Sequence, residues 1–392
     1  MAIKYGVFGA GYVGLSTACL LAINNKVKIF EIDSDKIAKI NNQRSPIKDS
    51  EIENFLTKEN VNIKALKFDE RYVDETDIWV LALPTNFNDS TNSFETSALE
   101  ELVNQLSALD PSKPIVIRST LPIGFLDYIE NKYAFAKCAY CPEFLREGRA
   151  LEDCLNPSRI VIGSSDKFVA NDFADALESS SNKLSVPKII TTSRSAEAIK
   201  LFSNAYLAMR VSFFNEIDTL SMLSSFKVDD VIKGLSEDPR IQFGYNNPSF
   251  AYGGYCLPKD VLQLISSTSE YNDHFPMINA IHLSNEERVR FIIKRIIETK
   301  ASNIGIYRMQ MKKNSDNARE AANLKVYMGL KEKGLSVKVY EPEVLSEIWQ
   351  QDLENDILRF KKNADLIVAN RKDTLLSDVQ EKLFTRDIYN EN

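Results

Sequence analysis

The sequence predicts an α/β fold in which two α/β domains are joined by a long central helix and a helical middle region. Three observations predict it. A glycine-rich motif at residues 9–14 follows an apolar strand at 3–8 and opens a helical run. A second alternation of strand and helix begins at 302–309. Between them, residues 195–225 are apolar nearly all round at helical spacing, which predicts a long, largely buried helix.

Length and composition set the outer limits. A chain of 392 residues is too long for one core, and we expect three domains, at residues 1–193, 194–300 and 301–392. Hydrophobic and charged fractions of 44% and 26% are typical of a globular protein. A net charge of −7 argues against a nucleic-acid partner, which would need a basic surface.

The cellular compartment is predicted from what the sequence contains. No apolar run approaches the roughly 18 residues of a membrane span. Met1 leads directly into a strand, so we expect no signal peptide and no membrane partner. Five cysteines without framework spacing fit a reducing cytoplasm. The C-A-Y-C pattern of Cys138 and Cys141 could indicate a redox pair, but we favour a strand that runs into a proline. Two histidines outside any motif argue against histidine-based catalysis, and we expect no metal site.

The motif at residues 9–14 is Gly9, Gly11 and Gly14 between a strand and a helix, the fingerprint of a Rossmann-like dinucleotide site. Its glycines permit a tight turn and close approach of a pyrophosphate to the helix N-terminus. The next strand, 26–30, ends at Glu31, where a carboxylate favours the free 2′-hydroxyl of NAD over NADP. Asp33 is the alternative carboxylate for the ribose if Glu31 points away.

Further strands are predicted within 77–84, 114–122, 139–148 and 158–163. Ligands of open parallel sheets bind beyond the carboxyl ends of strands. Candidate residues there are Thr85, Thr120, Glu143 and Glu147, although the two glutamates could equally be solvated loop charges.

The long helix should begin near Ser195, which can cap it, with Glu197 in the first turn. Lys200 and Asn204 stand one turn apart and could both donate to a single oxygen. The alternative is an ordinary polar stripe on a surface helix, which the apolar surroundings disfavour.

Residues 245–260 contain Cys256, between the pair Gly253–Gly254 and Pro258. Pro258 predicts the first turn of a helix, with the cysteine just before it. A helix N-terminus and Lys259 would both favour the thiolate, which makes Cys256 a candidate nucleophile and Asp260 a candidate base. An inert buried cysteine in a glycine-rich loop is the alternative.

The second α/β region has expected strands at 302–309, 335–342 and 364–369. The loop between the first strand and the next helix carries Lys312 and Lys313, and the helix bears Arg319. A basic loop there suits phosphate, although two lysines in a loop could be merely solvated. Residues from 376 onward carry no signal.

Five motifs in order carry a resemblance along nearly the whole chain. They are G-A-G-Y-V-G-L-S, P-E-F-L-R-E-G, E-A-I-K-L-F-S-N-A-Y-L-A-M-R-V-S-F-F-N-E, Y-N-N-P-S-F-A-Y-G-G-Y-C-L-P-K-D and Y-R-M-Q-M-K-K-N-S-D-N-A-R. The chain resembles the UDP-glucose 6-dehydrogenase family, of the short bacterial type. It departs from the family at Glu31, where Asp is usual, at Cys141, where Ser is common, and at Ala251, where Gly is common.

The resemblance implies an oxidation of UDP-glucose to UDP-glucuronate that removes four electrons with two NAD. Cys256 would add to the intermediate aldehyde as a thiohemiacetal and then form a thioester. Lys200 and Asn204 would stabilise the oxyanion. Asp260 and Thr120 would hold a water, with Glu143 assisting.

The resemblance also implies the binding residues. NAD would be held by Gly9, Gly11, Tyr12, Val13, Gly14, Glu31, Lys36, Thr85, Thr120, Glu147, Lys259 and Arg319. The sugar nucleotide would be held by Glu143, Phe144, Leu145, Arg146, Glu147, Lys200, Asn204, Arg240, Tyr245, Asn246, Ser249, Gly253 and Lys312. The three domains would bind NAD, form a homodimer around the catalytic cysteine, and bind the UDP-sugar. Arg240 is similar to an arginine that reaches the neighbouring subunit's substrate.

Three alternatives stay open at this point. The same chemistry could act on UDP-N-acetylmannosamine or GDP-mannose. A non-catalytic nucleotide-sugar sensor is disfavoured by the joint presence of Cys256, Lys200, Asn204 and Asp260. A plain two-electron dehydrogenase would differ in the NADH formed per sugar consumed.

Overall fold

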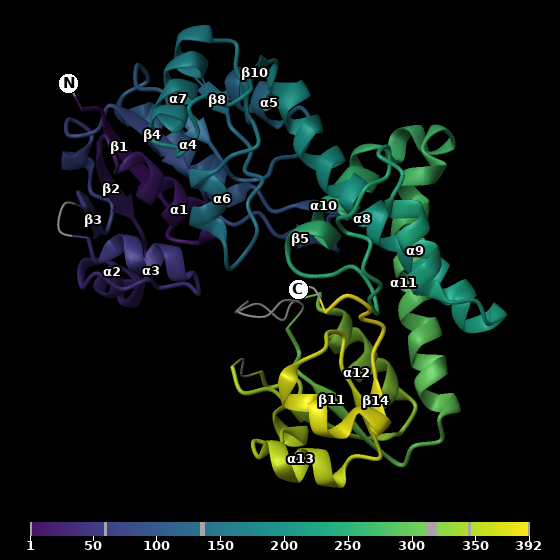
Figure 1. Ribbon diagram of the computed structural model, residues 1–392. Coiled ribbons are helices and arrows are strands. Elements are labelled where there is room, and N and C mark those ends of the chain that lie inside the picture. Colours follow the sequence, from purple (N-terminus) through teal and green to yellow (C-terminus); the bar gives the residue numbers. More distant parts are fainter. Residues whose placement is uncertain (1, 59–60, 134–137, 311–319, 344–345, 391–392) are drawn as a thin grey trace. The chain divides into compact units, whose positions relative to one another are not determined.

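The computed structural model describes residues 2–58, 61–133, 138–310, 320–343 and 346–390. The chain divides into two compact units, Met1–Phe202 and Ser203–Asn392, coloured purple to teal and teal to yellow in Figure 1. Each unit contains a predominantly parallel sheet with helices, which confirms the predicted α/β class with two Rossmann-like parts. The finer division into three domains stays a prediction.

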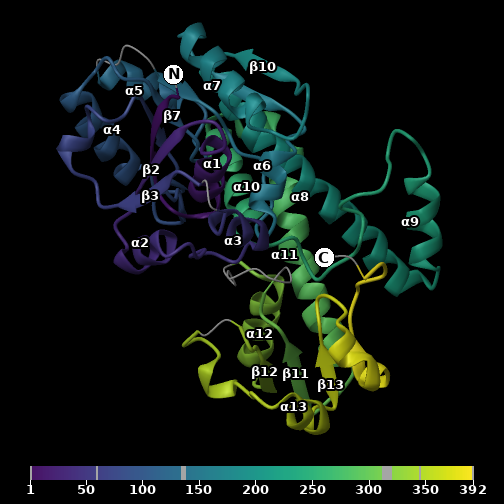
Figure 2. The ribbon, with the colours of Figure 1, turned by 60° about the vertical axis from the view of Figure 1, so that its left-hand side comes forward.

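The first unit is built on an eight-stranded sheet of order β10-β9-β8-β7-β4-β1-β2-β3, parallel except between β8 and β9 (Figure 2). Its strands are β1 Lys4–Phe8, β2 Lys26–Phe30, β3 Ile63–Leu66, β4 Ile78–Leu81, β7 Ile115–Ile117, β8 Cys138–Tyr140, β9 Ile160–Gly163 and β10 Lys188–Thr191, with a separate hairpin of β5 Phe87–Asn88 and β6 Ser93–Phe94. Its helices are α1 Tyr12–Leu21, α2 Ser34–Asn41, α3 Ser50–Leu56, η1 Glu70–Tyr72, α4 Ser97–Leu109, α5 Phe125–Lys132, α6 Ala150–Leu155, α7 Lys167–Ser179 and the start of α8 Ser193–Ser224.

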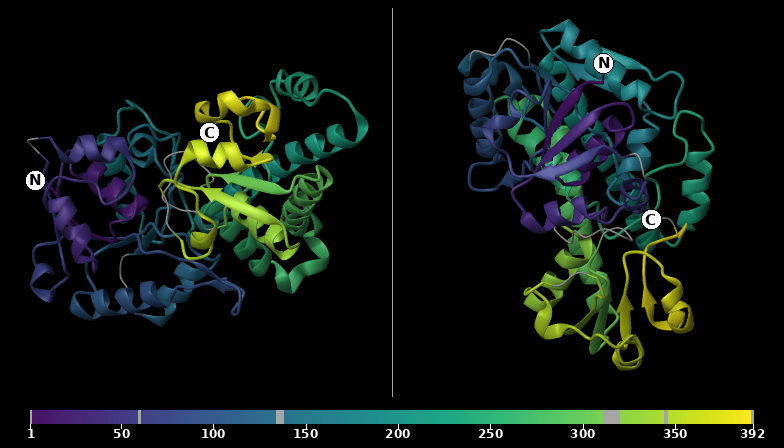
Figure 3. Two further views of the ribbon diagram at one scale, coloured as in Figure 1. Left: turned by 90° about the horizontal axis from the view of Figure 1, so that it is seen from below. Right: turned by 90° about the vertical axis from the view of Figure 1, so that its left-hand side faces the viewer.

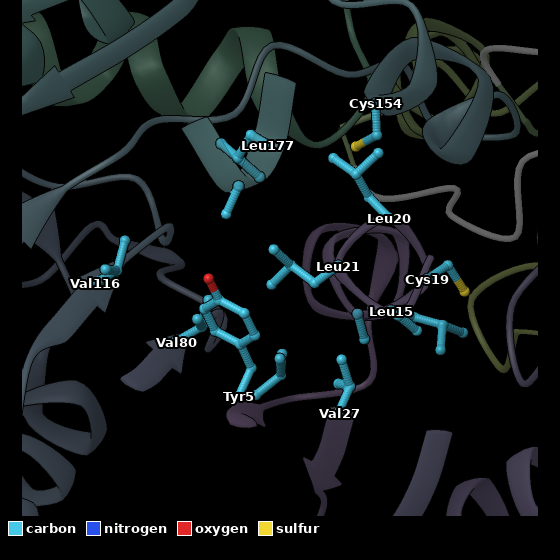
Figure 4. Close-up of a cluster of buried hydrophobic side chains, with 14 of the residues drawn as sticks. Tyr5, Leu15, Cys19, Leu20, Leu21, Val27, Val80, Val116, Cys154 and Leu177 are labelled. Carbon is cyan, nitrogen blue, oxygen red and sulfur yellow. The ribbon is translucent and has the colours of Figure 1, made fainter. Parts of the chain in front are cut away.

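Two apolar clusters cover the two faces of this sheet. On one face, α1, α3, α6 and α7 contribute to a cluster that includes Leu15, Leu21 and Phe173. Figure 4 shows Leu21 of α1 pointing toward Tyr5 of β1 within this cluster. On the other face, α4 and α5 pack against Trp79 and its neighbours. A sheet covered on both faces needs strands that are apolar on both sides, which explains the continuous apolar runs in the sequence.

The second unit holds the rest of α8 and a four-stranded parallel sheet of order β12-β11-β13-β14, seen as green and yellow arrows in the left panel of Figure 3. Its elements are α9 Val228–Ser236, α10 Cys256–Ser267, η2 Ser269–His274, α11 Pro276–Glu298, β11 Asn303–Tyr307, α12 Ala322–Glu332, β12 Ser336–Tyr340, η3 Gln350–Asp352, α13 Ile357–Asn363, β13 Leu366–Val368, η4 Thr374–Lys382 and β14 Leu383–Phe384. Helices α11 and α12 cover one face of the sheet and α13 the other.

Two helices begin near their predicted starts but differ from the prediction in detail. Helix α8 begins at Ser193, and the hydroxyl of Thr192, instead of Ser195, accepts a hydrogen bond from a backbone amide of the first turn, that of Ser195 (3.2 Å). Helix α10 begins at Cys256 itself. Strands β3, β10 and β14 and the β5–β6 hairpin were not predicted. Within the described ranges, no helix is both long and apolar enough to cross a membrane.

Candidate functional site

The loop between β1 and α1 is shaped by its glycines. Gly9 has φ +95°, and a Cβ there would lie 2.5 Å from the carbonyl oxygen of Ala82. A Cβ on Gly14 would lie 1.9 Å from the carbonyl oxygen of Gly9. A Cβ on Gly11 would meet nothing within 4 Å. Two glycines are therefore required by packing, whereas Gly11 keeps open the N-terminus of α1, where no side chain caps the first turn.

Glu31 follows β2, and its side chain is bonded to the glycine loop. Its Oε2 accepts from the backbone amide of Ala10 at 2.9 Å, and its Oε1 accepts from that of Ile32 at 2.8 Å. The ammonium of Lys36 lies 4.0 Å from Oε2. Asp33, the alternative ribose ligand, caps α2 by accepting from the amides of Asp35 and Lys36. Glu31 is therefore the better placed carboxylate for a ribose.

Two loops beyond the carboxyl ends of β4 and β7 are tied together. The buried hydroxyl of Thr85 donates to the carbonyl oxygen of Thr120 at 2.9 Å. The hydroxyl of Ser119 donates to the carbonyl oxygen of Leu83 at 2.8 Å. Thr120 itself is half-buried. The structure thus brings together two residues, Thr85 and Thr120, that the sequence predicted from separate strands.

Glu143 is part of a buried charge pair and is not a solvated loop charge. Its carboxylate pairs with the guanidinium of Arg118, a buried residue at the end of β7. The backbone carbonyl of Glu143 accepts from the ammonium of Lys200 at 2.7 Å. Sequence reasoning missed Arg118, although an arginine within an apolar strand was a usable signal, since buried charges are normally paired.

The remainder of the 143–147 segment is held by its own unit. Phe144 and Leu145 pack against the two apolar clusters. Arg146 forms an ion pair with Asp153 at 2.6 Å, so its guanidinium is engaged within α6 and the preceding loop. Glu147 is half-buried.

Lys200 and Asn204 do not share one oxygen in this structure. Lys200 bonds to Glu143, as above, while the amide of Asn204 donates to Oδ2 of Asp260 at 2.5 Å. Asp260 is fully buried, and its Oδ1 also accepts from the ammonium of Lys259 at 2.8 Å. Each group here contacts a different residue, and a common oxygen for the two side chains stays a prediction.

Cys256 differs from the other four cysteines. It is the first residue of α10 and is partly exposed, whereas Cys19, Cys138, Cys141 and Cys154 are buried. Burial raises the pKa of each buried thiol, that of Cys154 to about 11. Cys138 and Cys141 form no disulfide, in line with the predicted strand. Cys256 is therefore the cysteine best placed for chemistry.

Lys259, the cation beside Cys256, is buried. Burial lowers the pKa of the Lys259 ammonium, but attraction by Asp260 and Cys256 outweighs it, and the pKa is raised overall. Lys259 therefore stays charged next to the thiol. A helix N-terminus and an adjacent cation both stabilise a thiolate.

The loop before Cys256 is held by amide side chains from distant elements. Asn215 of α8 accepts from the backbone amide of Ser249 at 2.8 Å. Asn285 of α11 forms a pair of bonds with Tyr252, accepting at 2.8 Å and donating at 3.0 Å. Asn370, after β13, accepts from the amide of Phe250 at 2.9 Å. These supports were missed by sequence reasoning, because their sequence separations of 34, 33 and 120 residues follow no pattern.

The other predicted substrate residues fall into two groups. Asn246 and Ser249 are buried, and Asn246 donates to the hydroxyl of Ser236 at 2.8 Å. Tyr245 and Arg240 are exposed, and Arg240 is paired with Asp238 at 2.6 Å. Gly253 is half-buried. The predicted phosphate ligands Lys312 and Arg319, like Lys313, lie outside the described residues. Among the residues described, no cluster of side chains that could hold a metal ion is found.

Comparison with known proteins gives matches along the whole chain. Three models of the UDP-glucose/GDP-mannose dehydrogenase family match: its NAD binding domain at residues 3–178, its central domain at 194–287 and its UDP binding domain at 305–389. The chain is 40% identical over 393 residues to a UDP-glucose 6-dehydrogenase of Campylobacter jejuni, covering 99% of each. It is 39% identical to one of Streptococcus pneumoniae, again over 99% of each.

Solved structures support the fold. A UDP-glucose dehydrogenase of Pyrobaculum islandicum matches with a TM-score of 0.89 at 23% identity, over 99% of this chain and 95% of that one. A UDP-D-ManNAc dehydrogenase of Pyrococcus horikoshii matches with a TM-score of 0.84 at 22% identity, over 98% and 94%. At these identities the two structures speak for the fold alone.

Proposed function

The chain belongs to the UDP-glucose/GDP-mannose dehydrogenase family of NAD-dependent enzymes, and we propose that it oxidises UDP-glucose to UDP-glucuronate. The UDP binding domain of the family matches residues 305–389, which indicates a nucleotide-sugar substrate. The choice of UDP-glucose rests on the full-length relatives, both of which are named UDP-glucose 6-dehydrogenase. UDP-N-acetylmannosamine and GDP-mannose are the alternative substrates.

One observation carries the proposed chemistry. Cys256 is the partly exposed cysteine, stands at the N-terminus of α10, and has the buried pair Lys259–Asp260 in the following turn. An aldehyde has no second hydride to release until a nucleophile adds to its carbonyl carbon. A thiolate in this position supplies that nucleophile.

The proposed reaction runs in three steps. Loss of the hydroxyl proton and a hydride converts C6 of the sugar from alcohol to aldehyde. The Cys256 thiolate adds to the aldehyde as a thiohemiacetal, and loss of a second hydride leaves a thioester. Water then cleaves the C–S bond, which releases the carboxylate and restores the thiol.

The residues around Cys256 have proposed roles that follow their contacts. Asp260 receives hydrogen bonds from Asn204 and Lys259, so it is held as an acceptor for the proton of a water. Lys200 donates to the backbone carbonyl of Glu143 in the loop after β8. The same ammonium is proposed to stabilise the oxyanion. Thr120 is proposed to take part in holding the hydrolytic water.

The residues of the first unit fit NAD. Gly11 leaves the N-terminus of α1 open to a pyrophosphate, and the carboxylate of Glu31 stands at the end of β2 for a ribose. Val13, Lys36, Thr85 and Glu147 would complete the site. When bound, NAD accepts one hydride in each of the two oxidations. The negative charge of Glu31 would repel the 2′-phosphate of NADP.

We also infer a homodimer built on α8. Tyr206, Phe213 and Leu220 follow one another at seven-residue intervals on this helix and are 56%, 56% and 54% exposed. Side chains at this spacing share one face of a helix, so they form an apolar stripe suited to a second copy. A cytoplasmic location is proposed from the reduced cysteines.

The test is the number of NADH formed for each UDP-glucose consumed. We expect two, with UDP-glucuronate as the product. One NADH and a released aldehyde would instead identify a two-electron dehydrogenase, and no NADH would point to a sensor. Steady-state turnover with UDP-glucose, UDP-N-acetylmannosamine and GDP-mannose in parallel decides the sugar.

A further inference from the structure

Glu197 is a buried carboxylate that the proposed mechanism does not use. It lies on the first turns of α8, is 0% exposed and accepts two backbone hydrogen bonds. The amide of Gly124 donates to its Oε2 at 2.5 Å, and that of Leu126 donates to its Oε1 at 2.9 Å. An isolated carboxylate in the interior is costly, so a purely packing role would be better served by an apolar residue.

The two amides belong to the N-terminus of α5, which cannot cap itself. Its N-cap residue is Gly124, with φ +90°, and no side chain of its own segment bonds to the first turn. A carboxylate at a helix N-terminus satisfies its amides and complements its dipole. Glu197 therefore supplies, from another helix, the cap that the sequence of α5 lacks.

The capped helix directly follows the loop that carries Thr120. Residues 118–124 join β7 to α5, and their first half is tied to the loop after β4 through Ser119 and Thr120. Glu197 ties their second half to α8. Three residues further along α8, Lys200 bonds to the carbonyl of Glu143. The first turns of one helix thus hold both loops, after β7 and after β8, in which the proposed catalytic residues stand.

We propose that Glu197 is a positioning residue that fixes Thr120 relative to Lys200 and Glu143, and that its ionisation controls this clamp. The inference rests on the proposed function. An ionised carboxylate accepts from both amides, whereas a protonated one has a hydroxyl in place of one acceptor and holds the turn less tightly.

The carboxyl group titrates in an accessible range. Burial raises the pKa of Glu197 to about 7, and the hydrogen bonds from Leu126 and Gly124 offset this only in part. The charged groups that act on it are Asp127 of α5 and Arg194 of α8, which pair with each other at 2.6 Å. Their opposite effects on Glu197 partly cancel, so burial dominates. The clamp is therefore expected to tighten as the pH rises through about 7.

Hydrogen–deuterium exchange tests the clamp without any substrate. In Glu197→Ala, amides of residues 119–127 should exchange at least about tenfold faster than in the parent, because two of them lose their acceptor. Glu178→Gln is the matched control, since Glu178 also accepts from a backbone amide of another segment, Val186, at 2.8 Å. It should leave residues 119–127 unchanged. Equal exchange in parent and Glu197→Ala would overturn the clamp.

Kinetics test the positioning role. Glu197→Ala should lower kcat for UDP-glucose about tenfold or more while the KM for NAD stays within about twofold. Glu197→Gln, which keeps the size and one acceptor, should recover part of kcat and lose the rise in rate through neutral pH. Unchanged kcat and an unchanged pH profile with only a lower Tm would show a merely structural residue. A parent without UDP-glucose turnover would refute the proposed function, and the exchange experiment would still decide the clamp.

Discussion

The glycine loop at residues 9–14 and the cysteine loop at residues 245–255 are both irregular, yet they keep their shapes by different means. The glycine loop is determined by short-range sterics, since a Cβ on Gly9 or Gly14 would overlap a backbone oxygen. The cysteine loop is held by Asn215, Asn285 and Asn370, whose side chains arrive from α8, α11 and the end of β13. Backbone sterics therefore shape one loop, whereas side-chain hydrogen bonds from distant elements hold the other.

The difference matches the tasks proposed for the two loops. A pyrophosphate needs backbone amides and empty space, which glycines provide directly. A nucleophile needs a fixed position and a controlled charge, which demand support from several directions. Changes in the glycine loop should therefore affect folding and NAD binding, whereas changes in the cysteine loop should affect rate.

The largest expected effect is at Cys256. Cys256→Ala should lower four-electron turnover by about a thousandfold or more, because no other nucleophile replaces the thiol. Cys256→Ser should stall as an ester, with the mass of the sugar nucleotide added to the protein. Intact-protein mass spectrometry and NAD binding calorimetry measure both outcomes, and binding should be kept. Parent-rate UDP-glucuronate formation by Cys256→Ala would refute the thioester mechanism.

The next largest effects are expected from Lys200→Ala and Asn204→Ala. Each should lower kcat about a hundredfold, because each removes a proposed donor to the oxyanion. Asn204→Ala also removes a hydrogen-bond donor to Asp260. Circular dichroism and Tm serve as controls for folding. Turnover close to the parent's in either variant would exclude a role in stabilising the oxyanion.

A pair of glycine variants separates the two functions of the glycine loop. Gly14→Ala should destabilise the protein by about 1–3 kcal/mol or more, because its Cβ meets the backbone of Gly9. Gly11→Ala should change the free energy of unfolding by less than about 1 kcal/mol but weaken NAD binding. Urea unfolding and calorimetry measure the two quantities. Equal effects of both variants on stability would contradict the steric account.

The smallest effect on turnover is expected from a support of the cysteine loop. Asn285→Ala leaves the amide and carbonyl of Tyr252 buried without this partner, at about 1–3 kcal/mol for each group. The rate should fall with little change in NAD affinity. Asn171→Ala, which removes an exposed side chain bonded to its own helix at Lys167, is the control and should cost less than about 0.5 kcal/mol.

Predictions from the sequence were most accurate where the signal was local. The strand, turn and helix around Gly9 lie where their pattern predicted them. The same holds for Glu31 after its strand and for the buried strands that precede Thr85 and Thr120. Predictions were wrong where a competing partner decided. Ser195 does not cap α8, because the helix begins two residues earlier, at Ser193, and the hydroxyl of Thr192 accepts from the amide of Ser195. Lys200 and Asn204 have the predicted helical spacing, and a common oxygen for both side chains stays a prediction.

Residue order alone predicted the α/β class, the glycine motif and the candidate nucleophile, because each is marked by a pattern of residues within a few positions of one another. Tertiary structure decided which charges are paired and which loops are supported. Arg118 with Glu143, Glu197 with α5, and Asn285 with Tyr252 join residues far apart in the chain. The C-terminal segment, which carried no signal, supplies Arg386 to the buried Asp218. Such contacts follow no period, because they arise only when folding removes polar groups from water and each must find a partner.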